Sequence, residues 1–268
     1  MENSPTTTAM DVERYKQLRH LSRQIMSVLT KTIPREAIQE MGKALGLMQK
    51  GVLTLDTMDL ASVLMDSCLF DWIRDGKNLV EKYVEAYPPI PGTDEHVLLQ
   101  AYCRAKYRLL MPRAISPGAV TYWFDLLWGE LIALMDISLS RTMASGAGGL
   151  LATRTAPLGG CWITTGAPLP VGDRKTGEML LKTIRGGNLL EDRTSAGEHR
   201  LAMTLIRACL DAGAAEHVRY EDGDEDQAKE FNKPNSLTVM RSSRRHVDRN
   251  EPCPCGSGKR YRRCCMRK

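Results

Sequence analysis

The last sixteen residues of the sequence contain four cysteines in a compact spacing, and this pattern constrains the fold of that segment more than any other feature. Two cysteines flank a single residue, eight residues follow, and the other two cysteines are adjacent. Four thiolates satisfy the tetrahedral preference of a structural zinc site and leave no position open for water. Gly256 and Gly258 supply the backbone freedom that a tight turn around a metal requires. The spacing therefore predicts a closed zinc site with the ligands Cys253, Cys255, Cys264 and Cys265.

Two other uses of these cysteines compete with zinc. Adjacent residues such as Cys264 and Cys265 bridge each other only with strain, which argues against a simple redox disulfide. An iron–sulfur cluster also takes four thiolates, although a short hairpin rich in arginine is more typical of zinc. Because a segment this short has no core of its own, the bound metal has to supply the free energy of folding, which is on the order of 10 kcal/mol or more.

The same segment is strongly basic. Residues 241–268 hold ten lysines and arginines against Asp248 and Glu251, whereas the whole chain has a formal charge of only +5. A faintly acidic body therefore carries a basic tail. Such a tail suits either phosphate contacts with ribosomal or other RNA, or docking on an acidic protein surface. A merely solubilising tail would not need a metal site. The expected contact residues are Lys259, Arg260, Tyr261, Arg262 and Arg263.

Residues 250–265 resemble the SEC-C motif, best known at the C-terminus of the Sec preprotein translocase motor ATPase and in smaller bacterial proteins. All four ligand positions match, with Cys265 where some family members have histidine. The resemblance implies a bound zinc ion and docking to the export chaperone SecB, to ribosomes, or to both. The chain is not the motor ATPase, because Gly258 and Lys259 are followed by Arg260 and not by the serine or threonine of a Walker A loop.

We expect an α+β fold in which composition divides the chain into four parts. Residues 1–117 have mainly helical patterns, and residues 118–220 form a mixed region with a small sheet. Residues 221–249 are typical of a charged flexible linker that precedes the motif at residues 250–268. Within this linker, the acidic run 221–230 is either a solvated loop or an acidic partner surface.

In the first half, helical signals run from Asp11 to Met111. Pro34 suits the first turn of a helix that continues to about Lys50. Residues 60–70 are apolar on nearly every side, which predicts a buried helix. Thr93 is expected to cap a further helix that ends before Pro112.

In the second half, aromatic and β-branched residues appear together with glycine pairs, which predicts strands. Two helices should follow, at residues 175–184 and 196–212, the second with a capping box of Ser195 and Glu198 and a stop at Gly213. Residues 130–171 are faintly similar to the bodies of uncharacterised bacterial SEC-C proteins, a likeness that implies no activity. The candidate strands are residues 131–139, which could equally be helical, 150–155 and 160–165.

The main alternative function is an enzyme with its site between residues 118 and 215. Glu130, Asp136 and His199 would then serve as acid, base and orienting group, although nothing in the sequence brings them together. The glycines at 146, 148 and 149 belong either to a phosphate cradle or to a plain loop. Three aromatic residues belong either to the core or to an exposed binding patch: Trp123, Phe124 and Trp128.

No residue is assigned a catalytic role. Single thiols plus a metal site are typical of the cytosol. Residues 1–10 lack the apolar run of a signal peptide, and charged residues interrupt the most apolar stretch, 120–139. We therefore expect a cytoplasmic zinc-binding adaptor without a membrane span. Four further cysteines lie singly in apolar surroundings without a nearby histidine, as core residues do: Cys68, Cys103, Cys161 and Cys209.

Overall fold

The computed structural model describes residues 10–49, 51–55, 57–144, 149–165, 168–171 and 174–214, together with Arg263. By internal contacts the chain divides into two units, Met1–Glu221 and Asp222–Lys268. Every helix and strand described below belongs to the first unit. The predicted linker and the predicted zinc motif lie outside the described residues, except for Arg263.

The described chain begins with helices, as the sequence predicts. These are α1 (Val12–Lys31), α2 (Arg35–Ala44), α3 (Met58–Phe70), α4 (Leu79–Ala86) and α5 (Asp94–Cys103). Side-chain caps explain several of the starts, since Asp11, Thr57 and Thr93 each accept a backbone N–H of the first turn. The buried helix predicted over residues 60–70 is confirmed as α3.

The helix predicted to run from Pro34 to about Lys50 is wrong in its second half. It ends at Ala44, and Gly46 follows in the left-handed region at φ 73°. A two-stranded hairpin of β1 (Met48–Gln49) and β2 (Val52–Leu53) takes its place, with Gly51 at φ 79° in the turn.

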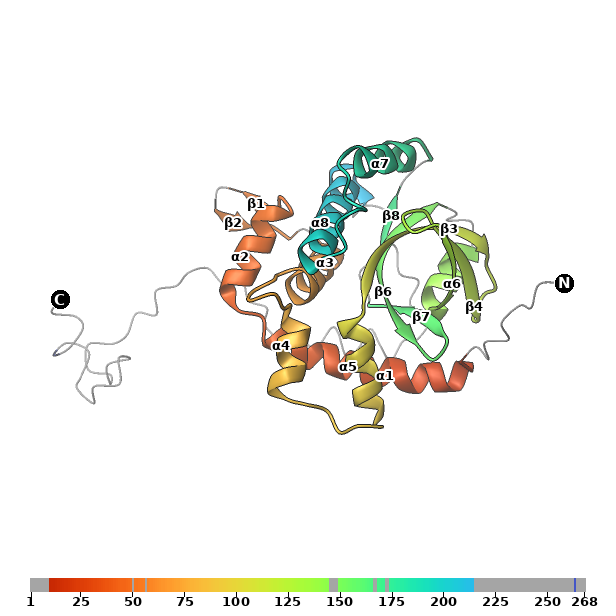
Figure 1. Ribbon diagram of the computed structural model, residues 1–268, viewed down its shortest axis with the longest axis horizontal. Coiled ribbons are helices and arrows are strands. Elements are labelled where there is room, and N and C mark those ends of the chain that lie inside the picture. The colour runs from red at the N-terminus through yellow and green to blue at the C-terminus, as the bar shows by residue number, and fades with distance from the viewer. Residues whose placement is uncertain are drawn as a thin grey trace. The chain divides into compact units, whose positions relative to one another are not determined.

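A closed β-barrel forms the centre of this unit (Figure 1). Its strands follow the order β3-β4-β5-β7-β6, and β6 pairs with β3 to close the sheet. β5 and β7 are parallel, and all other pairs are antiparallel. The helix α6 (Ile137–Ala144) lies between the third and fourth strands in sequence. This is the topology of the five-stranded Greek-key barrel known as the OB-fold. The strands are β3 (Lys106–Ala114), β4 (Val120–Asp125), β5 (Glu130–Met135), β6 (Leu150–Leu158), β7 (Cys161–Thr164) and β8 (Leu169–Val171), which extends the sheet beside β6.

The barrel corrects the helical interpretation of the sequence between Cys103 and Met111. The helix α5 stops at Cys103, and β3 begins at Lys106. Both faces of β3 are buried, because Leu109 packs outward under helices and Leu110 packs into the barrel. A strand buried on both faces has no alternation in its sequence and resembles a buried helix. Pro112 is tolerated because the register of β3 against β4 shifts between Pro112 and Ala114.

The other predicted strands are partly confirmed. The strand predicted over residues 131–139 ends at Met135, because Asp136 starts α6 by accepting the Leu139 N–H at 3.0 Å. The strands predicted over 150–155 and 160–165 are confirmed as β6 and β7. No strand was predicted over β4.

Two helices complete the unit, α7 (Arg174–Gly186) and α8 (Ser195–Asp211). The predicted capping box of α8 is wrong, since Thr194 is the cap and the side chain of Glu198 binds Lys106 instead. The predicted stop is confirmed, with Gly213 at φ 78°. None of the described helices combines the length and the apolar character that crossing a lipid bilayer requires.

Three apolar clusters hold the barrel and the helices together. One fills the barrel interior, with Leu110, Trp123, Ile132, Leu134 and Leu151. The second joins the outer side of β3, β6 and β8 to α2, α3, α7 and α8. The third joins the outer side of β6 and β7 to α1, α4 and α5. In Figure 1, α3, α7 and α8 lie to one side of the barrel, and α1 and α5 lie across its lower end.

Candidate functional site

The four predicted zinc ligands lie outside the described residues, as do Lys259, Arg260, Tyr261 and Arg262. Arg263 is described and exposed. Within the described residues, no group of three or more potential ligand side chains could hold a metal ion. The chemistry of the motif itself fits zinc, because it offers four cysteines in a short segment with the spacing of a closed site.

The four upstream cysteines are core residues, as predicted. Cys68, Cys161 and Cys209 are buried and Cys103 is partly buried. Burial raises the pKa of Cys68 and of Cys209 to about 12, and that of Cys103 and of Cys161 to about 11. These groups are therefore thiols at neutral pH, whereas both metal binding and nucleophilic attack require the thiolate.

A buried ion-pair cluster connects the barrel to α3. Arg154 on β6 donates from Nε to Asp66 Oδ2 at 2.9 Å and from Nη2 to Asp71 Oδ2 at 2.5 Å. All three side chains are buried. The guanidinium also lies over the rings of Phe70 and Tyr107. Burial and the nearby Asp66 carboxylate raise the pKa of Asp71 to about 7, although Arg154 opposes the shift.

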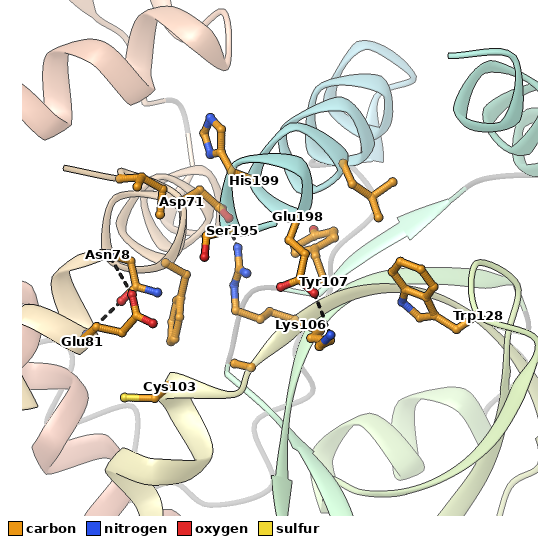
Figure 2. Close-up of a pocket in the computed structure, with 15 residues that line it drawn as sticks. Asp71, Asn78, Glu81, Cys103, Lys106, Tyr107, Trp128, Ser195, Glu198 and His199 are labelled. Atoms are coloured by element: carbon orange, nitrogen blue, oxygen red, sulfur yellow. Dashed lines mark hydrogen bonds and ion pairs between the residues drawn. The ribbon is translucent and has the colours of Figure 1, made fainter. Parts of the chain in front are cut away.

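A small cavity of about 100 Å³ lies beside this cluster (Figure 2). Its walls come from the end of α3, from α4, from the α5–β3 junction, from the β4–β5 turn and from the start of α8. In Figure 2, Glu198 points toward Lys106, while its neighbour His199 points away from that lysine. The labelled lining residues are Asp71, Asn78, Glu81, Cys103, Lys106, Tyr107, Trp128, Ser195, Glu198 and His199.

Most polar groups of this cavity already have partners. Lys106 Nζ binds Glu198 Oε1 at 2.6 Å, and Asn78 and Glu81 form the capping box of α4. Burial and the nearby Arg154 lower the pKa of His199, which favours the neutral imidazole. His199 Nδ1 and Trp128 Nε1 are buried without a hydrogen-bond partner among the described residues. The engaged carboxylates and the protonated Cys103 thiol make this arrangement better suited to holding the fold together than to nucleophilic catalysis.

The structure does not bring together the residues of the enzyme hypothesis. Asp136 accepts a hydrogen bond from the Thr164 hydroxyl, and Glu130 pairs with Arg108. Neither carboxylate lines the cavity that contains His199. The glycines at 146 and 148 lie outside the described residues.

Of the two interpretations of the aromatic residues, core or exposed patch, Trp123 is core, because its side chain is fully buried in the barrel interior. Trp128 is partly buried, lines the cavity and carries the Arg193 guanidinium 4.0 Å above its ring. Phe124 is partly exposed on the outside of the barrel.

Sequence reasoning missed a second buried arginine. Arg108 on β3 points into the barrel, where it donates to Asp125 Oδ2 at 2.5 Å and to Thr155 Oγ1 at 3.0 Å. Its guanidinium stacks 4.1 Å from the centre of the Trp162 ring. An arginine inside an apolar strand is the one signal that could have predicted a buried charge cluster.

Comparison with known families accounts for most of the chain. Residues 9–189 match the model of a family of unknown function, DUF7986. The chain belongs to this family. The DUF7986 match covers α1 to α7 and the whole barrel. A second match, at residues 249–267, is to the SEC-C motif, which confirms the motif predicted from the cysteine spacing.

Curated relatives of this DUF7986 protein match over short stretches only. The protein translocase subunit SecA of Oleidesulfovibrio alaskensis is 50% identical over 48 residues, which are 18% of this chain and 5% of that protein. SecA 1 of Rhodopirellula baltica is 52% identical over 33 residues, 12% of this chain and 3% of that protein. SecA of Bordetella pertussis is 42% identical over 50 residues, which are 18% of this chain and 6% of that protein. The chain thus spans a small fraction of these relatives, and no solved structure matches it.

Proposed function

We propose that this DUF7986 protein is a zinc-binding adaptor that docks through its SEC-C motif on a protein of the export machinery, with the chaperone SecB as the first candidate. The observation that carries the proposal is the SEC-C match at residues 249–267, which contains four cysteines in ligand spacing. Relatives over short stretches are named protein translocase subunit SecA, and this supports an export context. The DUF7986 body would be the part that the motif recruits, in the cytoplasm.

Zinc binding in this proposal falls to Cys253, Cys255, Cys264 and Cys265. When bound, the ion would supply the free energy that folds the motif, because a segment of this length cannot build a core. The four upstream cysteines do not compete for the metal, since burial keeps them as thiols. Residues 221–249 would serve as the linker that lets the motif reach its partner.

Docking in this proposal depends on charge complementarity and on contact with one aromatic ring. Lys259, Arg260, Arg262 and Arg263 would meet an acidic protein surface, and Tyr261 would supply apolar contact area among them. Complementary charge speeds association and selects against basic partners. The body lacks this charge excess, since the basic residues of the chain concentrate after residue 240.

Zinc binding is tested by metal analysis of the purified full chain. We expect one zinc ion per chain, and we expect the Cys264→Ser variant to lose most of it because a thiolate ligand is gone. Cys103→Ser is the matched control, since it removes a partly buried body cysteine and should leave the zinc content unchanged. Equal zinc content in the wild type and in Cys264→Ser would contradict the ligand assignment.

Docking is tested by titrating purified SecB with the full chain in a calorimeter. A variant with alanine at residues 260–263 should keep its zinc and lose at least tenfold in affinity, because it removes three charges and the tyrosine. The matched control removes three exposed cations from the body helices, Arg23, Lys182 and Arg185, and should bind as the wild type does. If SecB does not bind while ribosomes capture the chain with steep salt dependence, RNA contact replaces protein docking as the function of the tail.

A further inference from the structure

The outer side of the barrel has an uncovered patch on β3, β4 and β5, distinct from the SEC-C motif. We call this patch the aromatic face and define it by Arg113, Tyr122, Phe124 and Leu131. The Tyr122 residue is 45% exposed and Leu131 is 62% exposed. None of Tyr122, Phe124 and Leu131 belongs to the three apolar clusters that hold the unit together. The folding of the barrel therefore does not explain why large apolar side chains lie here.

Strand pairing makes these side chains neighbours. Phe124 on β4 lies opposite Leu131 on β5 and opposite Met111 on β3. Tyr122 precedes Phe124 by two residues, so both side chains lie on the same side of β4, while Trp123 between them points into the barrel. The Arg113 guanidinium lies 5.2 Å from the centre of the Phe124 ring. Two aromatic rings and an arginine plane thus share one surface.

The charged group on this surface is a cation. Arg113 on β3 is exposed, lies over the Phe124 ring and has no ion-pair partner among the described residues. The acidic residues of the same strands and of the start of α6 are engaged elsewhere. The buried Asp125 and the half-exposed Glu130 both bind Arg108, and Asp136 accepts from the Thr164 hydroxyl.

We infer that the aromatic face is a binding site for single-stranded nucleic acid, held by base stacking on Tyr122 and Phe124 and by phosphate contact with Arg113. Alternate residues of a strand lie about 7 Å apart, which allows one base to stack on each ring along an extended backbone. Stacking on aromatic side chains tolerates any base sequence, and arginine adds cation–π contact.

The barrel topology agrees with this choice of ligand. OB-folds bind oligonucleotides or oligosaccharides on the face of their second and third strands, which are β4 and β5 here. Between these two ligands, the residues favour nucleic acid. Sugar hydroxyls need polar side chains such as carboxylates beside the rings, whereas the two carboxylates of β4 and β5 bind Arg108 and the free charges are cationic.

The test is fluorescence anisotropy of a labelled twelve-nucleotide oligothymidylate with the full chain. In all samples alanine at Arg260, Arg262 and Arg263 lowers the formal charge of residues 241–268 from +8 to +5. Because every sample shares this tail, a difference between variants reports on the aromatic face. We expect Tyr122→Ala with Phe124→Ala to weaken binding at least tenfold, since both stacking platforms are lost. Tyr122→Phe keeps the ring and should retain binding.

A matched control removes two exposed side chains elsewhere, Tyr87 (65% exposed) and Met179 (66% exposed), by substitution with alanine. This control should bind the oligonucleotide as the unsubstituted sample does, and circular dichroism should show each variant folded. The inference is overturned if the oligonucleotide does not bind, or if the double alanine variant binds as tightly as the control. The SecB titration is independent of both outcomes, because the aromatic face and the tail contain different residues.

Discussion

The outer surface of the barrel is covered by helices along β3, β6 and β7, but part of β4 and β5 has no such cover. On the covered side, Leu109 and Ala152 are fully buried beneath helices. On the open side, Leu131 of β5 is 62% exposed although it also lies on the outside of the barrel. The difference lies in which helices the rest of the chain brings to each side. The comparison separates residues that stabilise the unit from residues that remain available to a ligand.

The largest effect is expected on the covered side at Arg154. Changing Arg154 to alanine leaves Asp66 and Asp71 buried without their cation, and breaking such a cluster costs about 3–5 kcal/mol. The free energy of unfolding, measured by urea denaturation with tryptophan fluorescence, should fall by this amount. Arg113→Ala on the open side is the control and should change stability by less than about 0.5 kcal/mol. Equal losses for the two variants would remove the distinction between the two sides.

A smaller loss is expected for a leucine beneath the helices. Leu109→Ala should lower the free energy of unfolding by about 2–5 kcal/mol, because a fully buried side chain leaves a cavity between β3 and the helices. The same urea titration measures it. A loss under about 1 kcal/mol would mean that the helices pack loosely on this side.

The sequence predicted the parts of this architecture that depend on local signals. The buried character of α3 and the cap of α5 could be recognised because each depends on residues within one or two turns. β3 was missed because burial on both faces removes the alternation that reveals a strand. The Arg154 cluster could not be predicted, because its partners lie 88 and 83 residues away in sequence. The zinc ligands, in contrast, are a prediction that rests on cysteine spacing within the last sixteen residues.

The pH dependence of the unfolding free energy should report the raised pKa of the Asp71 carboxyl group. Its pKa is raised to about 7 in the folded chain, whereas an unfolded aspartate has a pKa of about 3.9. Between these values the folded state binds more protons than the unfolded state, so stability falls as the pH rises through this window. The contribution is fully present below about pH 4 and is lost above about pH 7, with a slope of up to about 1.4 kcal/mol per pH unit.

Asp71→Asn removes this group and keeps an oxygen that can accept from Arg154. The difference in unfolding free energy between the wild type and Asp71→Asn should therefore shift in favour of the variant from pH 5 to pH 8. Urea titrations at three pH values measure the shift. A difference that stays constant with pH would show that Asp71 is ionised throughout and that its pKa is not raised.

The smallest change in unfolding free energy is expected on the open side of the barrel, where it should be close to zero. Leu131→Ala removes a side chain of the same type as Leu109, from the same barrel, but it removes mostly exposed surface. Its cost should lie within about 0.5 kcal/mol in the same urea titration, since surface substitutions away from packed groups are nearly neutral. Because Leu131 belongs to the aromatic face, the variant should bind oligothymidylate more weakly while unfolding as the wild type does. A large loss of stability would mean that part of the chain covers the face, and the apparent site would then be core. Stability and binding are thus expected to separate at Leu109, which lies beneath helices, and Leu131, which is mostly exposed.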